Sequence, residues 1–243
     1  MKRSDFLKLL TASTASLFIP QLSGEEVDPF SPPKVIQYET NRAFTTAGPG
    51  FGRRLSITFD DGPNPSTTNM VLNELKKRDI KATFFLIGKN VDAFPDSVKK
   101  IRDEGHELAN HSYTHPALKN MPEEKVRSEI ARCQESIEKA SGIKPVWFRP
   151  PYGSFSQKQQ HITSDFQLSV ALWSLDPFDW KRPGSSVVAQ RVLTQSNPGS
   201  VILLHDIHKQ TAEAVPAILD GLLERDYTFA TMSEFLGDPL LPL

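Results

Sequence analysis

Several features that are scarce in this sequence narrow the range of functions before any motif is considered. The 243 residues include a single cysteine, Cys133, which excludes a fold held together by internal disulfides. The formal net charge is -1 at pH 7, so the chain has no positive field to hold nucleic acid or an anionic membrane surface. Internal repeats and low-complexity segments are absent as well, which excludes a repeat array.

A long hydrophobic run is also missing, so no stable membrane span is expected. The apolar stretch Leu9–Ile19 is too short for a bilayer core of about 30 Å, which requires about 20 such residues. Basic residues precede this stretch and a proline follows it, so residues 1–23 are predicted to be an export signal with a cut near Ser23. A buried N-terminal helix is the alternative, although hydroxyl residues interrupt any helical stripe. We therefore expect an exported protein in the periplasm, the cell envelope or the extracellular medium.

Composition divides the rest of the chain into two parts. Residues 24–53 are rich in proline and glycine, which is typical of a linker or of an N-terminal arm laid over a domain. Residues 54–243 are predicted to form one catalytic domain, because a chain of this size commonly forms a single α/β barrel with a full hydrophobic core. We expect a monomer.

After Arg54, short apolar runs alternate with segments of helical periodicity. The strands are predicted at 54–59, 82–87, 106–110, 146–149, 168–174, 200–205 and 228–231. The helices are predicted at 67–78, 95–104, 122–141, 186–195 and 211–225. Runs such as 82–87 are apolar at consecutive positions, as expected of parallel strands that are buried on both faces. The pattern predicts an α/β fold in which about seven strands form a closed or nearly closed barrel.

Chemically active side chains stand at or just past the ends of several predicted strands. They are Asp60, Asp61, His111, Arg149, Asp176 and His205. In a parallel barrel the C-terminal ends of the strands meet on one rim, and that rim carries the active site. Each residue alone also has a structural interpretation, since an aspartate pair often caps a helix and a lone arginine often forms a salt bridge. Their shared position favours one common functional site.

Two histidines and one carboxylate are typical of a catalytic metal site. Asp61, His111 and His115 fill three positions of an ion and leave the others for water and substrate. A metal such as Zn²⁺ lowers the pKa of bound water from about 15.7 to about 7. A carboxylate with a pKa of about 4 can then act as a base, and the adjacent Asp60 is the candidate.

Other rim residues offer an acid and a hydrogen-bond donor. His205 has a pKa range suited to the protonation of a leaving amine, so it is the candidate acid. Arg149 is expected to pair with a rim carboxylate. Two prolines without N–H groups follow it, so Tyr152 supplies the first backbone donor and is a candidate to stabilise an oxyanion. The ring of Tyr152 is also a candidate to stack on a sugar face, although a plain turn remains the alternative for this segment.

Five motifs together resemble the polysaccharide deacetylases of carbohydrate esterase family 4, the NodB homology domain. In chain order they are TFDDGP (58–63), HSYTH (111–115), RPPYG (149–153), DPFDW (176–180) and LLHD (203–206). They cover about residues 54–238, and no key position departs from the family pattern. The resemblance implies a distorted (β/α)7 barrel of the polysaccharide deacetylase type.

The resemblance also implies a cofactor and a pocket. One divalent metal, Zn²⁺ above all, with Co²⁺, Mn²⁺ or Ni²⁺ as alternatives, is held by Asp61, His111 and His115. Trp180 and Leu203 line the pocket for the methyl group of the acetyl substituent.

Catalytic roles follow from the same resemblance. It implies Asp60 as base and His205 as acid, with Arg149 orienting Asp60 and Asp179 tuning His205. The reaction is hydrolysis of an N-acetyl group on a hexosamine polymer or oligomer, with acetate and a free amine as products. Export fits such a glycan substrate, because glycans of the cell wall or surroundings lie outside the cytoplasm.

Alternative functions remain open at this point. The glycan is peptidoglycan, a chitin-type oligomer, or O-acetylated xylan, and related barrels act on small cyclic amides. A glycan-binding module without turnover keeps the same shape, but the intact Asp60 and His205 argue against it. A non-haem Fe(II) oxygenase also uses two histidines and a carboxylate. It needs no aspartate beside the ligand and usually has a β-sandwich scaffold, so the alternating pattern disfavours it.

Overall fold

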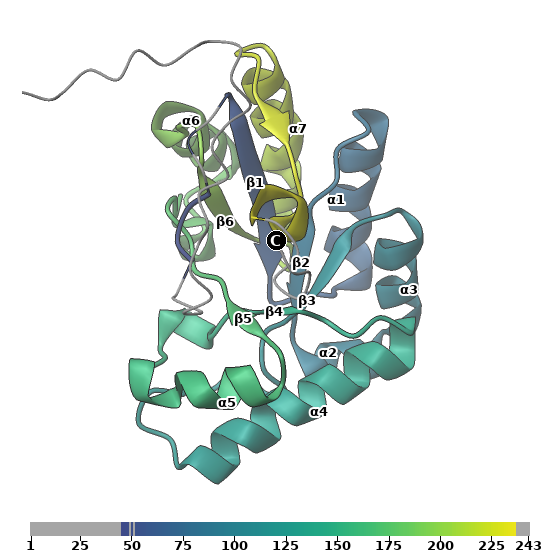
Figure 1. Ribbon diagram of the computed structural model, residues 1–243. Coiled ribbons are helices and arrows are strands. Elements are labelled where there is room, and N and C mark those ends of the chain that lie inside the picture. The colour runs from purple at the N-terminus through teal and green to yellow at the C-terminus, as the bar shows by residue number, and fades with distance from the viewer. Residues whose placement is uncertain (1–44, 49, 51, 237–243) are drawn as a thin grey trace, which may run out of the picture. The chain divides into compact units, whose positions relative to one another are not determined.

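The computed structural model describes residues 45–48, 50 and 52–236 (Figure 1). These residues belong to one compact unit, Tyr38–Leu243. The predicted export signal and most of the predicted linker lie outside the described residues, so both remain predictions. Among the helices that are described, none is both long enough and apolar enough to cross a membrane.

Seven parallel strands form the centre of the described part of the chain. They are β1 (Arg54–Asp60), β2 (Thr83–Leu86), β3 (Glu107–Asn110), β4 (Trp147–Phe148), β5 (Ser169–Val170), β6 (Val201–His205) and β7 (Thr228–Phe229). Each lies within the segment predicted for it, or extends one residue beyond it. β4, β5 and β7 are shorter than predicted, since only two residues of each form ladder pairs.

An isolated bridge brings the two ends of the strand row together. The order is β5-β4-β3-β2-β1-β6, and β7 pairs with β1. Beyond β5 the chain continues to Leu175, which pairs with Ile202 of β6. The predicted distorted barrel is therefore confirmed, and β5 and β6 are joined by this single bridge instead of a continuous ladder.

Helices surround the strands. They are α1 (Pro65–Lys77), α2 (Gly88–Ala93), α3 (Pro95–Asp103), α4 (Glu123–Ser141), α5 (Gln160–Asp165), α6 (Ser185–Gln195), α7 (Lys209–Leu223) and α8 (Met232–Leu236). Neighbouring helices contact one another in the order α6, α7, α1, α3, α4 and α5 (Figure 1). The five predicted helices are confirmed to within two residues at each end. The sequence analysis missed α2, α5 and α8, because helices of five or six residues are too short to establish a period.

Local signals set the start of α1 directly after the aspartate pair. The side-chain oxygen of Asn64 accepts hydrogen bonds from the backbone N–H groups of Ser66 and Thr67, and Pro65 occupies the first turn. The chain must therefore turn between β1 and α1 over the few residues 61–64. This turn holds Asp61 at the rim of the barrel.

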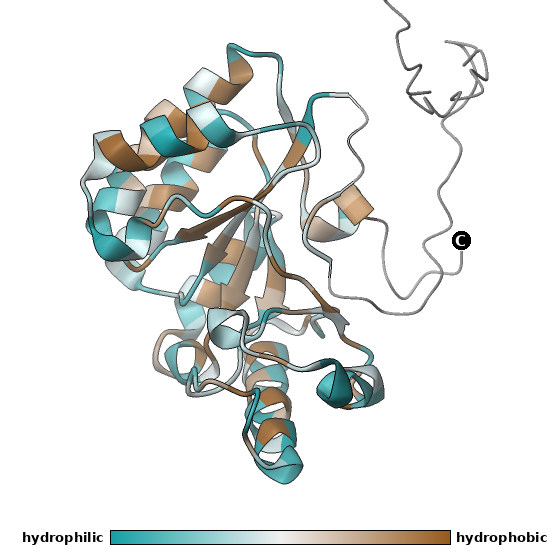
Figure 2. Cartoon of the chain, turned by 90° about the vertical axis from the view of Figure 1, so that its left-hand side faces the viewer, coloured by the Kyte–Doolittle hydropathy of each residue, from teal (hydrophilic) through white to brown (hydrophobic). Residues whose placement is uncertain are grey.

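The two-residue period of a strand divides the side chains of the barrel into an outer and an inner set. On β1, Leu55, Ile57 and Phe59 belong to the large hydrophobic cluster under the helices. The alternate positions, Thr58 and Asp60, face the interior, where both contact the side chain of Arg149. In Figure 2 the hydrophobic colour runs along the strands. On the inner face, Thr58 and Asp60 make it polar toward the C-terminal ends of the strands, and Thr83 and Glu107 form a second polar group at the N-terminal ends.

Apolar side chains fill the opposite end of the interior. Phe85, Trp147 and Val201 form one cluster there with Met232 and Phe235 of α8. The interior below the rim is therefore largely a packed apolar core, apart from the hydrogen-bonded group of Thr83, Glu107 and Ser233.

We expect acid to weaken the fold through His106. Burial, with a smaller contribution from the charge of Lys81, lowers the pKa of His106 to about 4. Its Nδ1 accepts a hydrogen bond from the backbone N–H of Ala82. In the unfolded chain His106 takes up a proton near pH 6.5, whereas in the fold it does so only near pH 4. The contribution of neutral His106 to the free energy of unfolding is therefore complete above pH 6.5. It is lost as pH falls toward 4, at a cost of about 3 kcal/mol. Urea unfolding at pH 7 and pH 4.5 measures the loss. It should be smaller in His106→Gln by about 2 kcal/mol, and equal losses would contradict this role.

Candidate active site

Alternation along the strands places the predicted site residues on the inner face. The register of β1 and β6 sets Asp60 beside His205, and Leu203 shares the inner face of β6 with His205. His111 stands directly after β3, and Arg149 directly after β4. Residues that are far apart in the sequence therefore meet at one rim, as the strand pattern predicted.

The turn after β1 is held by the segment that follows β2. The carbonyl of Gly62, which precedes a cis peptide bond to Pro63, accepts a hydrogen bond of 3.0 Å from the N–H of Ile87. The side-chain amide of Asn90 donates to the carbonyl of Asp61 at 2.8 Å. Asp61 itself has a positive φ of 73°, a conformation that a non-glycine residue keeps only when its surroundings fix it. These contacts turn its carboxylate toward the histidines.

Asp61, His111 and His115 form the metal-like cluster that the sequence predicted. One ligand atom from each residue lies within 4.8 Å of the other two. Oδ1 of Asp61 lies 3.5 Å from Nε2 of His111 and 3.2 Å from Nε2 of His115. Burial raises the pKa of Asp61, but the imidazoles of His111 and His115 outweigh it and hold the pKa well below its usual range. The carboxylate is therefore ionised.

The atoms of this cluster fit a cation. Nδ1 of His111 lies 2.7 Å from the carbonyl oxygen of Arg149, which can only accept, so this nitrogen carries the proton. In the neutral ring, Nε2 then presents a lone pair toward Asp61. Oδ1 of Asp61 is buried and has no hydrogen-bond partner among the described residues. Burial above all lowers the pKa of His115 and favours the neutral, ligating form. Converging lone pairs of this kind are satisfied by a divalent metal.

A buried arginine lies beneath Asp60. Arg149 is completely buried, and its guanidinium donates to Oδ1 of Asp60 at 2.7 Å and to Oγ1 of Thr58 at 2.8 Å. The other Nη donates to the carbonyl of Leu172 at 2.9 Å, and the group stacks on Phe85 with 3.9 Å to the ring centroid. Burial lowers the pKa of Arg149 and Asp60 opposes this shift, but an arginine stays charged. The contacts fix the plane of the Asp60 carboxylate.

His205 is held by a second buried carboxylate. Its Nδ1 lies 2.8 Å from Oδ1 of Asp179, and its backbone N–H donates to Oδ2 of the same residue at 2.8 Å. The hydroxyl of Thr211 and the N–H of Trp180 also donate to this carboxylate. Burial lowers the pKa of His205, but the hydrogen bond and charge of Asp179 outweigh it and raise the pKa to about 9. The imidazole is therefore protonated near neutral pH, with Nε2–H free of Asp179.

Tyr152 and Leu203 occupy contrasting surroundings. Tyr152 is 71% exposed, with a φ of 59°, and its ring packs edge-on against His115 at a centroid distance of 4.7 Å. Leu203 is buried on the inner face of β6. The structure thus brings Tyr152 next to a metal-ligand candidate, whereas Leu203 lies within the barrel beside the Asp60 strand.

The segment formed by Phe178 and η3 (Asp179–Lys181) presents aromatic rings to solvent. Trp180 is 47% exposed and Phe178 is 41% exposed, and their rings meet edge-on at 6.2 Å. The ammonium group of Lys181 lies within 5 Å of both ring centroids, at 4.7 Å from Phe178 and 4.9 Å from Trp180. Asp176 points back into its own segment, where it accepts from the N–H of Phe178 at 2.7 Å. Asp176 therefore shapes this loop and makes no contact of its own with the metal-like cluster among the described residues.

One buried acid, Asp206, belongs to a motif found in the sequence but received no predicted role there. Asp206 is completely buried and accepts a hydrogen bond from the hydroxyl of Thr68 on α1. Burial raises its pKa to about 7. A Cβ built on Gly62 would meet Oδ1 of Asp206 at 2.6 Å, so any larger residue there would force the buried Asp206 carboxylate to shift. The only sequence signal was its place beside His205 at the end of β6.

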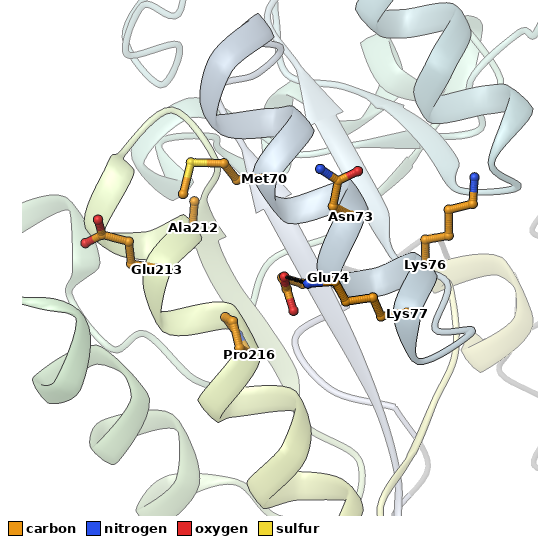
Figure 3. Close-up of a pocket in the computed structure, with 8 residues that line it drawn as sticks. All are labelled: Met70, Asn73, Glu74, Lys76, Lys77, Ala212, Glu213 and Pro216. Carbon is orange, nitrogen blue, oxygen red and sulfur yellow. Dashed lines mark hydrogen bonds and ion pairs between the residues drawn. The ribbon is translucent and has the colours of Figure 1, made fainter.

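A surface pocket lies away from this rim, between α1 and α7 (Figure 3). Its volume is about 470 Å³, and its lining includes Met70, Lys77, Glu213 and Pro216. None of the predicted site residues lines it. This pocket is therefore separate from the rim that carries the predicted site residues.

Comparison with known proteins identifies relatives of this chain. A model of the polysaccharide deacetylase family matches residues 48–171. The chain is 39% identical over 180 residues to the peptidoglycan-N-acetylmuramic acid deacetylase PdaC of Bacillus subtilis, which covers 74% of this chain and 38% of that protein. It therefore spans well under half the length of PdaC.

This chain spans a larger share of two further relatives. A peptidoglycan-N-acetylglucosamine deacetylase of Bacillus cereus is 39% identical over 227 residues, covering 89% of this chain and 80% of that protein. Among solved structures, a carbohydrate esterase family 4 pseudoenzyme from Bacillus anthracis has a TM-score of 0.77 at 34% identity, covering 81% of this chain and 72% of that chain.

Replacement of the buried arginine should unfold the barrel more readily than replacement of an exposed one. Arg149→Ala removes the partner of Asp60 and leaves a buried charge, so we expect a loss of about 3 to 5 kcal/mol in the free energy of unfolding. The matched control is Arg127→Ala, since Arg127 pairs with Glu123 and Asp165 at the surface. Its expected loss is below about 1 kcal/mol. Similar losses in the two variants, measured by urea denaturation, would show that Arg149 is not a structural requirement.

Proposed function

Since this chain belongs to the polysaccharide deacetylase family, we propose that it is a metal-dependent hydrolase that removes N-acetyl groups from glycans containing N-acetylhexosamines. The substrates are peptidoglycan or chitin-type oligomers, and the products are acetate and a free amine. One observation carries this proposal: Asp60 and His205 stand side by side on neighbouring strands at the rim that also holds the Asp61, His111 and His115 cluster.

The cofactor is a single divalent metal, which we take to be zinc. Asp61, His111 and His115 would hold it, since their donor atoms suit zinc and their number leaves positions open for water and substrate. When bound, such an ion acts as a Lewis acid that makes water acidic enough to be a nucleophile at neutral pH. The two histidines must be neutral to ligate, and the proton on Nδ1 of His111, held by the Arg149 carbonyl, keeps its Nε2 available.

Asp60 serves as the base in this proposal. Its Oδ1 is held by Arg149, whereas its Oδ2 lies 3.6 Å from Nε2 of His111, on the side of the cluster. Oδ2 is therefore directed to take the proton of the attacking water. The hydrogen bond from Arg149 fixes the plane of the Asp60 carboxylate, so no reorientation is needed when the proton moves.

His205 serves as the acid. With a pKa of about 9 it carries a proton at neutral pH, and Asp179 holds Nδ1 so that Nε2 is the nitrogen that donates. Protonation of the leaving nitrogen is the step that amide hydrolysis requires, because an amide anion is too basic to depart. The cationic imidazole also attracts the negative charge that develops on the carbonyl oxygen, and the N–H of Tyr152 is proposed as a further donor to it.

Exposed aromatic rings near this rim suit a sugar polymer. Tyr152 borders His115, and Trp180 extends from the segment that carries Asp179. Both are proposed to contact the glycan, with Trp180 and Leu203 lining the acetyl-methyl pocket. An exported protein meets such glycans at the cell wall, which agrees with the relatives named as peptidoglycan deacetylases.

Glycan binding without turnover is the second candidate, because one structural relative is described as a pseudoenzyme. Acetate release distinguishes the candidates. The full chain is incubated with chitooligosaccharides, peptidoglycan and acetylxylan, with and without a chelator. We expect chelator-sensitive acetate release from the N-acetylated glycans. Release from acetylxylan alone would reassign the substrate to O-acetyl groups. Binding without release from any glycan would support the second candidate.

Loss of the base and loss of a ligand should have separable effects. Asp60→Asn keeps the hydrogen bond to Arg149, so the metal should remain while the rate falls about 10²- to 10⁴-fold. His111→Ala should empty the site, because two ligands remain. Metal content by mass spectrometry and acetate release are measured on the same preparations. Near-normal turnover by Asp60→Asn would remove Asp60 from the mechanism, and full metal occupancy in His111→Ala would reject the ligand assignment.

The alkaline limit of activity should depend on Asp179. As an acid, His205 must be protonated, so activity is present below its pKa and is lost as pH rises through about 9. In Asp179→Asn the pKa of His205 should fall toward its ordinary value, and the alkaline limb of kcat/KM should move down by about one to two pH units. Glu123→Gln is the matched control, since Glu123 pairs with His161 at the surface. An unchanged alkaline limb in Asp179→Asn would assign that limb to another group.

A further inference from the structure

We infer that Glu129 of α4 is a positioning residue for the metal ligand His115, acting through the backbone of the loop that joins the two ligand histidines. The inference rests on the proposed function, because it concerns the same metal site. Glu129 is not in the metal-like cluster, and it lies on a helix whose sequence signalled only an apolar stripe. Its carboxylate instead binds the loop from outside.

The loop between His111 and His115 has a backbone that needs external support. Ser112 has a φ of 62° and His115 has a φ of 65°, so two non-glycine residues of a five-residue segment adopt the left-handed region. A non-glycine residue in this region is strained relative to an ordinary conformation and persists only where its surroundings hold it. The second ligand of the pair is therefore held in a conformation that it would leave if its surroundings relaxed.

Glu129 accepts three hydrogen bonds from the middle of this loop. Its Oε2 accepts from the backbone N–H groups of Tyr113 at 2.9 Å and Thr114 at 2.7 Å. Its Oε1 accepts from the hydroxyl of Thr114 at 2.8 Å. Two consecutive amides that converge on one carboxylate oxygen fix the local backbone, and a charged acceptor makes each bond stronger than a neutral one. His115 follows immediately after Thr114.

The other backbone contacts of the loop do not involve the amides of Tyr113 and Thr114. The carbonyls of Ser112 and Tyr113 accept from the N–H groups of Gly88 and Lys89 at the start of α2, both at 3.0 Å. The N–H of His115 donates to Oγ of Ser112 at 3.1 Å. These contacts use the carbonyls on one side and the last amide. The amides of Tyr113 and Thr114 point to α4, where Glu129 meets them.

Neighbouring residues of α4 also contact the same loop, at its N-terminal end and at the ring of Tyr113. The amide nitrogen of Asn110 donates to the carbonyl of Ile130 at 3.0 Å, and its oxygen accepts from the N–H of Ser112 at 2.9 Å. The guanidinium of Arg132 stacks on the ring of Tyr113 at 3.6 Å. α4 therefore holds the histidine loop at several points. Of these contacts, the hydrogen bond of Glu129 to Thr114 is adjacent in the chain to His115.

Loss of Glu129 should loosen His115 and so weaken the metal site. Groups that orient metal ligands typically contribute 10- to 100-fold to metal affinity. We expect Glu129→Ala to raise the zinc dissociation constant by about this factor. Glu129→Gln should stay within about threefold of the wild type, because its amide oxygen can accept both N–H bonds while its NH₂ group donates to the Thr114 hydroxyl.

The experiment measures zinc binding by competition with a chromophoric chelator, using the full chain stripped of metal. It includes Glu129→Ala, Glu129→Gln and Glu135→Ala, an exposed glutamate of the same helix that serves as the control. Thermal unfolding of the metal-free forms reports folding. Hydrogen exchange at the amides of Tyr113 and Thr114 reports the loop itself. If Glu129→Ala fails to fold, Glu129→Asp replaces it, since the shorter carboxylate cannot reach both amides.

The inference predicts weakened zinc binding and faster exchange of the two amides in Glu129→Ala, recovery in Glu129→Gln, and no change in Glu135→Ala. Wild-type affinity in Glu129→Ala would overturn it and leave the proposed function intact. Equal weakening in Glu129→Gln and Glu129→Ala would also overturn it, because the negative charge would then matter more than the hydrogen bonds. A wild-type chain that binds no zinc would overturn both the inference and the metal dependence of the proposed function.

Discussion

Negative charge buried at the mouth of a barrel is the constraint on which the rest of the site depends. Asp60 and Asp179 are almost completely buried, and Asp61 lies close by with a buried oxygen that has no hydrogen-bond partner in the described part of the chain. Carboxylates in such a place are costly unless each is paired. Arg149 compensates Asp60, and His205 compensates Asp179. Asp61 is left facing two imidazoles whose lone pairs also need a cation. A divalent metal would satisfy all three groups at once.

Much of this arrangement could be predicted from the sequence, because the physical rules behind it are periodic. Consecutive apolar residues in runs such as 82–87 indicated parallel strands, and the rim residues followed directly at strand ends. A two-residue period then fixes which side chains share the inner face, as it does for Leu203 and His205. The pairing of Arg149 with a rim carboxylate was expected from charge alone. The fold, and the placement of these residues at one rim, were therefore accessible from the sequence.

Other features could not be predicted, because they depend on contacts between distant segments or on single backbone angles. The positive φ of Asp61 and His115 is set by tertiary hydrogen bonds, and no local sequence signal specifies it. Glu129 accepts hydrogen bonds from the histidine loop, and the amphipathic pattern of α4 gives no sign of this contact. Asp206 is buried behind the rim only because α1 and the turn at Gly62 close over it. Helices of five or six residues, such as α2, are likewise too short to show a helical period in the sequence.

The outer helices and the inner face of the barrel therefore have different roles. The outer helices supply apolar burial and, through α2 and α4, hold the loops that carry Asp61, His111 and His115. The inner face supplies the charged groups.

The decisive measurement is zinc K-edge X-ray absorption on the full chain loaded with one equivalent of Zn²⁺. Two imidazole nitrogens at about 2.0–2.1 Å and carboxylate oxygen at about 2.0–2.2 Å are expected. A spectrum with oxygen neighbours alone, or loss of the zinc on desalting, would contradict a metal held by Asp61, His111 and His115.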